Sequence, residues 1–455
     1  MTSSNPVSNW VPPDPLGPDK RVPLMRGRRL EMFKALEDHD SYYELSLMFS
    51  ALAGDLQQLG ANLPGSSSAA LKIRQDKTNK RAMCILLHSI LKDLLRSVIL
   101  GTVAFDMISP TRKPAHYAAD GPGAYVAAMA IDGRDGKWLN RDEIRDLIKT
   151  LNMYVKAYEA WKIHKGKPDN AEARDLDKFA REIDTQYGSR YAEQPDEMRF
   201  VNHDDATAKT QFFMNSLIQR CDPSLPGPDQ IYQIASPLYV GCSESMNVSI
   251  TKYQPSTGLR LVNKPWGLVC CALKYMGKHP TVVVTPVIRT WQRTDLPLAE
   301  ILVTMLGSSL VTQDGFNGHG PGTTNDTSTQ SVLSEAERYV LALEPHLKNN
   351  IEASLREMAE RKTYFERMEV VARFPDTDAE SALGDLRKLE HEIYAIDDQC
   401  AALVRKLEAD RAEMEAQTKA AERYVKLLRE VNQVFRIFFG PEQVKEEPTP
   451  TDEEE

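Results

Sequence analysis

Long runs of apolar residues are missing from this chain of 455 residues. A membrane-spanning helix needs about 20 consecutive, mainly apolar residues, so we expect no transmembrane helix and no membrane partner. Residues 1–19 are polar and rich in proline, and they lack the apolar core of a signal peptide. These absences predict an intracellular protein of the cytoplasm or the nucleus.

Cysteine is scarce, with six residues, and no Cys-x-x-Cys or His-x-x-x-His spacing occurs. Neither a disulfide framework nor a zinc site is therefore predicted, and no metal or cofactor is implied. Cys270 and Cys271 lie in an apolar run, which favours buried thiols over a nucleophile with His279 as its base. No motif combines a nucleophile, a base and an oxyanion site, although an active site built from distant residues leaves an enzyme as one hypothesis.

A surplus of basic residues is also absent, because the formal net charge is −9. Proteins that coat nucleic acid are usually basic, so this balance counts against that class. Seven acidic residues lie in the last fourteen positions, and residues 440–455 are predicted to form a disordered acidic tail. Without this tail the body of the chain is nearly neutral.

A mainly α fold is predicted, and it begins with a helical N-terminal body. Residues 1–27 are predicted to be a flexible Pro-rich arm and residues 28–228 a helical domain. Apolar periodicity places helices at residues 28–59, 69–103, 141–165, 170–187 and 204–220. The second of these is apolar over much of its surface, which is typical of a helix at the centre of a bundle.

After Pro228 the composition changes to clusters of β-branched and aromatic residues between turns. Residues 229–312 are predicted to form a small α+β subdomain with an antiparallel sheet. Its strands are predicted at residues 230–240, 247–253, 259–262, 268–275 and 281–290, and its helix at 296–310. The glycine-rich run that follows lacks the lysine of a P-loop, so residues 313–333 are predicted to be a linker.

Residues 334–439 are predicted to form two long helices arranged as a coiled-coil αα-hairpin. The first helix begins at a capping box, Ser334 and Glu337, and Pro345 is expected to kink it. A second capping box, Thr377 and Glu380, begins the last helix.

The last helix carries a heptad repeat that continues over eight heptads, with apolar residues at the a and d positions except for Asp410 and Gln417. A straight helix of period 3.6 drifts by about 20° per heptad and would lose this register, so the repeat favours a coiled coil. The predicted coiled-coil interface residues are Leu386, Leu389, Ile393, Ile396, Leu403, Leu407, Met414, Tyr424, Leu428, Val431 and Phe435.

Charges beside the repeat restrict how this helix can pair. Three pairs of like charge would face each other in a parallel, in-register dimer, which is therefore disfavoured. These pairs are Asp385–Glu390, Glu392–Asp397 and Lys406–Arg411. The helix either folds back on residues 334–372 or pairs with a second copy in the antiparallel sense, and its wide apolar end needs more than one neighbour.

Basic residues cluster at the start of the helical body and again around residue 75. Such clusters can bind phosphates, although a solvated helix face is the commoner use of them. The candidate phosphate-binding residues are Arg26, Arg28, Arg29, Lys72, Arg74, Lys77, Lys80 and Arg81.

The leading hypothesis is a non-enzymatic structural or scaffold protein that associates with itself, or with another helical protein, through the C-terminal coiled coil. The alternative is a nucleic-acid-coating protein of coat or nucleocapsid type, which would bind RNA or DNA with its arm and its basic clusters.

Overall fold

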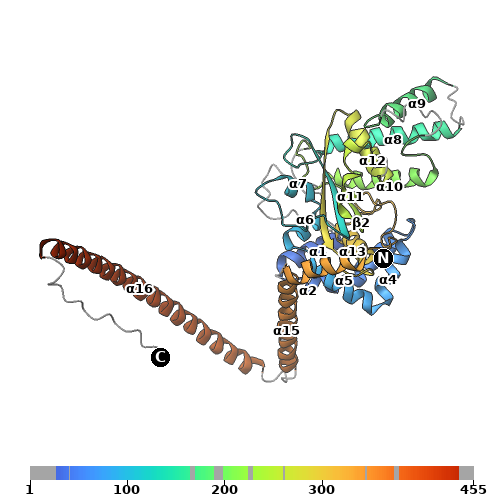
Figure 1. Cartoon of the computed structure of the whole chain (residues 1–455). Helices are drawn as coiled ribbons and strands as arrows, with labels where there is room; N and C mark the ends of the chain where they lie inside the picture. Colours follow the sequence, from blue (N-terminus) through green and yellow to red (C-terminus); the bar gives the residue numbers. More distant parts are fainter. Residues whose placement is uncertain are drawn as a thin grey trace. The chain divides into compact units, whose positions relative to one another are not determined.

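The computed structural model describes residues 27–39, 41–163, 170–188, 198–223, 229–259, 262–343, 346–372 and 379–439. Within these ranges the chain is mainly helical, with a three-stranded antiparallel sheet and a long C-terminal helix, which confirms the predicted fold class (Figure 1). The chain divides into two units, Met1–Lys362 and Thr363–Glu455. The first unit holds the sheet and the buried core, and the second holds the long helix.

The sheet has the strand order β2-β1-β3, and all its pairings are antiparallel. The central strand β1 (Gly123–Ile131) pairs with β2 (Tyr239–Ser243) on one side and with β3 (Pro280–Arg289) on the other. Every residue of β1 is buried, so its sequence shows no alternation of polar and apolar residues. Helix α13 (Asp295–Gly307) packs against β1 and β2.

Helices described before the sheet are α1 (Gly27–Asp38), α2 (Tyr43–Leu47), α3 (Phe49–Leu59), α4 (Ser66–Gln75), α5 (Lys77–Ser89), α6 (Lys92–Leu100) and α7 (Val103–Ile108). They divide the two long helices predicted at residues 28–59 and 69–103. The breaks have local causes: Asp76 caps α5 by accepting a hydrogen bond from the Thr78 backbone, and Ile90 is extended between α5 and α6. Gly101, with φ +74°, ends α6.

Three further helices confirm their predictions to within a few residues. They are α8 (Arg141–Ile163), α9 (Ala171–Asp184) and α10 (Asp204–Arg220), and they pack with α12 (Lys264–Tyr275). α9 and α10 begin at side-chain caps. Asn170 accepts a hydrogen bond from the Ala173 backbone (2.8 Å), and His203 accepts one from the Ala206 backbone (3.0 Å).

Two of the predicted strands are wrong because the residues are helical. Helix α11 (Met246–Thr251) replaces the strand predicted at 247–253, and α12 replaces the one at 268–275. A short apolar run does not distinguish a buried strand from a buried helix, and α12 is apolar all round because it is buried all round. The Asn263 cap and Pro265 in its first turn are the start signals that the prediction overlooked.

The other predicted strands had mixed outcomes. β3 confirms the strand at 281–290, and α13 confirms the helix at 296–310. Only the last two residues of the strand predicted at 230–240 belong to β2. The described part of 259–262 is a turn in which Leu259 has φ +51°.

The segment predicted to be a linker, residues 313–333, packs into the body instead. Phe316 is fully buried, and its ring stacks on Phe213 with centroids 4.7 Å apart. The Asn317 side chain makes two hydrogen bonds, 2.8 and 2.7 Å long, with the backbone of Val240 in β2. Glycine is used here for close packing rather than flexibility, because a Cβ on Gly315 would overlap the Ser309 backbone.

The predicted domain boundaries differ from the units of the structure. Strand β1 lies in the predicted helical domain, whereas its partners β2 and β3 lie in the predicted α+β subdomain, so a boundary at residue 228 would divide one sheet. The predicted arm up to residue 26 and the acidic tail at 440–455 lie outside the described residues.

The first of the C-terminal helices begins earlier than predicted. Helix α14 (Gln330–Arg338) starts after Thr329, so Ser334 and Glu337 lie inside it and do not form the predicted capping box. A π-helical turn, Tyr339–Leu343, comes next, and α15 (His346–Ala372) follows. The predicted kink at Pro345 and cap at Thr377 lie outside the described residues.

Helix α16 (Ala379–Phe439) is a single helix of 61 residues, which confirms the long C-terminal helix. Its pairing with another helix stays a prediction. None of the helices in the described part of the chain is both long enough and apolar enough to cross a membrane.

Candidate functional site

Helix α16 exposes the apolar positions of its heptad repeat. We call the a and d residues from Leu386 to Val431 the heptad face. Its large apolar side chains are between 42% and 68% exposed. They are Leu386, Leu389, Ile393, Ile396, Leu403, Leu407, Met414, Tyr424, Leu428 and Val431. Phe435 belongs to the same helix, but its side chain lies outside the described ones.

The heptad face is a continuous apolar stripe on a very long helix. At 1.5 Å per residue, the 61 residues of α16 extend about 90 Å. Most of the stability of a helix in a protein comes from packing its apolar face, and burying one leucine contributes about 1.5–3 kcal/mol. Monomeric proteins seldom expose apolar patches larger than a few hundred Å². Burial of this stripe against another apolar surface would therefore be strongly favourable.

Charged residues flank the heptad face in an uneven order. Four acidic residues occupy the first e and g positions, namely Asp385, Glu390, Glu392 and Asp397. Lys406 and Arg411 come next, then Glu413, and the later e and g positions up to Leu427 carry no charge. Arg411 also pairs with Glu415 of its own helix at 3.1 Å. Because the charges are distributed unevenly along α16, a parallel partner and an antiparallel partner would face different charges.

The candidate phosphate-binding residues are mostly held by internal acceptors. Arg28 pairs with Glu31 and Asp55, and Arg29 pairs with Asp314 at 2.5 Å and donates to a backbone carbonyl of α6. A cavity of about 570 Å³ beside α1 is lined by these two arginines and by none of the other candidates.

The remaining candidates lie on α4 and α5. Lys72 donates to the backbone oxygen of Gly322 (2.6 Å) and Arg74 to the side chain of Gln57 (2.8 Å). Lys80 donates to the Ser50 hydroxyl at 3.1 Å. Lys77 and Arg81 are exposed, and Arg26 lies outside the described residues. Each of these contacts uses one donor of a side chain that carries three donors in lysine or five in arginine.

Comparison with known proteins assigns no function to these residues. The chain matches no protein-family model, and neither the curated proteins nor the solved structures contain a match to it. The geometry of the chain itself is the basis for assigning a function.

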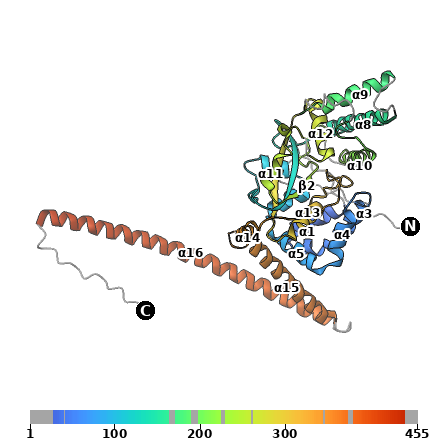
Figure 2. The same cartoon turned by 45° about the vertical axis from the view of Figure 1, so that its right-hand side comes forward.

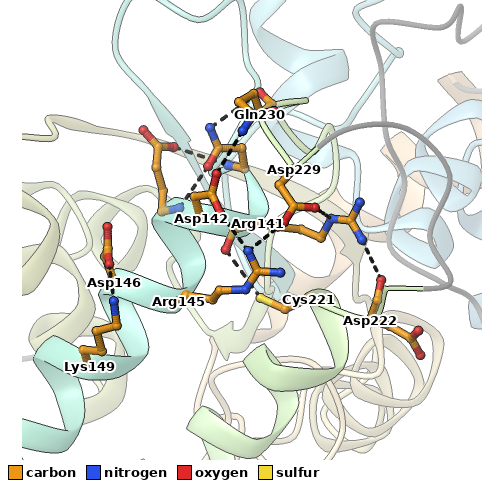
Figure 3. Close-up of polar contacts among 11 residues, drawn as sticks. Arg141, Asp142, Arg145, Asp146, Lys149, Cys221, Asp222, Asp229 and Gln230 are labelled. Atoms are coloured by element: carbon orange, nitrogen blue, oxygen red, sulfur yellow. Dashed lines mark hydrogen bonds and ion pairs between the residues drawn. The ribbon is translucent and has the colours of Figure 1, made fainter.

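A charged network joins the start of α8 to the segment after α10 (Figure 3). Arg141, which is 4% exposed, pairs with Asp229 at 2.7 Å and donates to the backbone oxygen of Asp222 at 2.9 Å. Arg145 pairs with both Asp142 and Asp229, each at 2.7 Å. Because these charges satisfy one another, the network anchors the chain on either side of residues 224–228 rather than offering a ligand site.

The two adjacent cysteines are buried thiols, as expected, although they lie on α12 and not on a strand. Both are fully buried. Burial raises the pKa of Cys270 and raises that of Cys271 to about 12. A thiol with so high a pKa holds almost no thiolate at neutral pH, so neither residue suits a nucleophile.

A polar pocket of about 390 Å³ was not predicted from the sequence. It lies where the start of α10 approaches the start of α12. Its lining includes the ionisable side chains of His203, Asp205, Lys209, Lys264 and His319. Lys209 and His319 are 110 residues apart in the chain, so no local sequence motif could have predicted the pocket. The run around His319 was instead predicted to be part of a linker.

Proposed function

We propose that the protein is a non-enzymatic structural protein that self-associates by pairing α16 with α16 of a second copy in the antiparallel sense. The observation that carries this proposal is the heptad face, an exposed apolar stripe that keeps its register from Leu386 to Val431. An exposed stripe of this length indicates an interface whose partner is a second molecule.

Charge favours the antiparallel sense. A parallel pair brings g residues opposite e residues of the next heptad, and three such pairs have like charges. An antiparallel pair instead brings a opposite d, e opposite e and g opposite g. We align the two copies so that Leu386 faces Val431 and Leu389 faces Leu428, which overlaps the helices over nearly their full length.

At the centre of the paired helices, this alignment brings apolar side chains, and side chains of opposite charge, to facing positions. Leu403 of one copy faces Met414 of the other, and Ile396 faces the small Ala421. Lys406 faces Glu413, an opposite charge, and no two like charges meet at the e or g positions. The polar Asp410 faces Leu407 at the middle of the interface, where it costs stability but restricts register.

Neighbouring alignments are less favourable. A slide of one heptad in one direction brings Lys406 opposite Lys406 of the second copy. It also brings Asp397 opposite Arg411, which replaces the attraction between Lys406 and Glu413 but does not remove the added repulsion. The same slide in the other direction brings Glu413 opposite Glu413 and Arg411 opposite Arg411. Like charges at facing positions are destabilising by a few tenths of a kcal/mol each, so the charges favour the fully overlapped register.

The competing partner for the heptad face is α15 of the same chain. It also exposes large apolar side chains, among them Leu355, Met358 and Phe365. With 27 residues it is about 40 Å long, less than half the length of α16, and would leave the rest of the heptad face uncovered. A second copy of α16 matches the full length.

The test is the oligomeric state of the full chain and of the variant Leu403→Glu, measured by size exclusion with light scattering. We expect a defined oligomer for the wild type and at least a 100-fold weaker association for the variant, of order 3 kcal/mol, because two leucines per pair leave the interface. Ala412→Glu is the matched control, since position 412 lies on the opposite side of the helix and its substitution adds the same charge.

A wild-type monomer at micromolar concentration contradicts the proposal and supports the hairpin with α15. Equal effects of the two substitutions also contradict it. Light absorption is recorded at 260 and 280 nm in the same run, because a large particle rich in nucleic acid would favour the coat-type alternative.

A further inference from the structure

Arg289, the last residue of β3, is a buried cation without an anionic partner. The residue is 5% exposed, and within the part of the chain that the structure describes no ion pair or hydrogen bond involves its guanidinium. Its Nε is enclosed and has no hydrogen-bond partner. Guanidinium groups stay positively charged in proteins, and charged side chains are almost never buried unless they are paired. Arg289 therefore carries an uncompensated charge inside the fold.

Two other buried arginines show what normally balances such a charge. Arg220 is 2% exposed and donates to both oxygens of Asp314 at 2.7 Å. Arg141 is 4% exposed and pairs with Asp229 at 2.7 Å. Burying a charge is costly unless a charge of the opposite sign accompanies it. Arg289 differs from both residues, because no carboxylate in the described ranges accepts from it.

The guanidinium of Arg289 lies over an aromatic ring. Its Cζ is 4.7 Å from the centroid of the Tyr339 ring. Tyr339 begins the π-helical turn Tyr339–Leu343 that follows α14, and Figure 2 shows α14 at the edge of the first unit. A cation–π contact attracts the charge, but it supplies no oxygen acceptor for the N–H groups. π-Helical turns occur frequently at functional sites.

Two glycines leave room beside this guanidinium. Arg289 is paired with Gly123 of β1, and its side chain reaches Gly121, whose φ is +77°. The atoms nearest to a Cβ built on Gly121 would be Arg289 Nη2 at 3.7 Å, Val332 Cγ1 at 3.8 Å and Arg289 Nε at 3.9 Å. A space as wide as a methyl group therefore lies beside the arginine nitrogens. Gly121, Val332 and Tyr339 are all partly exposed, so this space lies near the surface.

We infer that Arg289 anchors a binding site for a small oxyanion, either a phosphate or the carboxylate of a small organic acid. Two oxygens of one group match the fork of N–H donors that a guanidinium presents. The anion accepts from Nη2 on the side of Gly121, and the ring of Tyr339 fixes the orientation of the guanidinium. The site is separate from the pairing of α16, because Gly121, Arg289 and Tyr339 all belong to the first unit.

Calorimetric titration of the full chain at low ionic strength tests the inference. The probes are inorganic phosphate, acetate and chloride. Saturable binding of one oxyanion per chain is expected, and the tighter of phosphate and acetate identifies the source as a phosphate or a carboxylate. Chloride offers a single atom to the fork, so it should bind at least about 10-fold more weakly. Chloride binding as tight as that of both oxyanions contradicts the inference.

The variant Arg289→Lys keeps the charge but loses the fork, and it should weaken binding of the tighter oxyanion by at least about 10-fold. Arg289→Met should abolish this binding. Without added anion, Arg289→Met should melt at or above the temperature of the wild type, because it removes a buried charge that has no partner. A saturating oxyanion should raise the melting temperature of the wild type and leave that of Arg289→Met unchanged.

Arg338→Met is the matched control, since Arg338 is exposed on the neighbouring helix α14. An equal loss of binding in this control overturns the inference, because it would indicate general charge attraction. Absence of saturable binding of both oxyanions up to about 10 mM overturns it too.

A structural role for Arg289 gives a different result. Arg289→Met would then melt at a lower temperature than the wild type, and neither phosphate nor acetate would stabilise the wild type; this combination overturns the inference. The variant Leu403→Glu should bind the oxyanion as the wild type does, so failure of this site and failure of self-association are separately visible.

Discussion

Arg220 holds Asp314 through two parallel hydrogen bonds, Nε to Oδ1 and Nη2 to Oδ2, each 2.7 Å long. The residues are 94 positions apart, and the pair joins the end of α10 to the segment after α13. Arg29 reaches the same carboxylate from α1, so Asp314 is the shared acceptor of two arginines. This contact ties a segment that was predicted to be a linker into the folded body.

The substitution Asp314→Ala is expected to lower the free energy of unfolding by about 3–5 kcal/mol, because it leaves a buried guanidinium without its carboxylate. Burial lowers the pKa of Arg220, and Asp314 is the group that opposes this. Urea unfolding followed by tryptophan fluorescence measures the change.

The control for this measurement is Asp146→Ala, which removes an exposed ion pair with Lys149. Exposed pairs contribute about 0–1 kcal/mol, so this variant should unfold close to the wild type. Similar losses of unfolding free energy in the two variants would mean that the contact between Arg220 and Asp314 stabilises the fold no more than an exposed ion pair does.

Cross-linking through Cys400 tests the direction and register proposed for α16. This cysteine occupies an a position and is exposed. In the fully overlapped antiparallel pair it faces Gln417 of the second copy, so Gln417→Cys should form a disulfide-linked dimer under mild oxidation. Non-reducing electrophoresis detects the product.

The other arrangements give different cross-links. A parallel, in-register pair brings Cys400 of both copies together, so the wild type itself would cross-link. A hairpin with α15 predicts no linked dimer for either protein. Ala416→Cys is the control, because its side chain lies away from the heptad face and its thiol should remain unlinked.

Asp184 makes stability depend on pH between about 4 and 6. Burial raises its pKa to about 6, although Tyr154 donates to Oδ1 at 2.5 Å and the Arg199 backbone to Oδ2 at 3.1 Å. In the unfolded chain the pKa is about 3.9. The native state therefore binds more protons in this window, and stability falls as the pH rises, by up to about 3 kcal/mol.

The variant Asp184→Asn should flatten this part of the pH profile, measured by urea unfolding at pH 4, 5 and 6. Part of the slope will remain, because burial also raises the pKa of Asp295 to about 6. Glu143 acts with the opposite sign: hydrogen bonds from Arg134 and Lys278 outweigh its burial and lower its pKa to about 2. Its contribution to stability is therefore lost as the pH falls from about 4.5 towards 2, and near pH 4 it opposes the slope from Asp184. An identical slope in Asp184→Asn would contradict the assignment.

Several elements could be predicted because local signals agree with the tertiary structure. Helix α10 occupies the residues predicted for it, and its apolar spacing and its cap at His203 lie within one short stretch. The long helix α16 follows in the same way from a repeat of seven that needs no distant residue. The heptad face was therefore found from the sequence, together with the charges that favour one direction of pairing.

Other elements misled prediction because burial removes the pattern on which it relies. Strand β1 and helix α12 are both apolar on all sides, and β1 was not predicted as a strand at all. Their periodicity disappears when every face is buried, so only length and flanking residues could separate strand from helix. The glycines around Phe316 suggested a linker by composition, whereas they allow the backbone to pack closely.

The sequence by itself determined the mainly helical class, the helices α8 to α10, the strand β3 and the long heptad helix, because each depends on spacing within one segment. Only the tertiary structure decided the sheet order, the burial of residues 315–318 and 320–322, and the pocket in which Lys209 meets His319. These features depend on residues that lie about a hundred or more positions apart, and their encounter is set by how the whole core packs rather than by any local pattern.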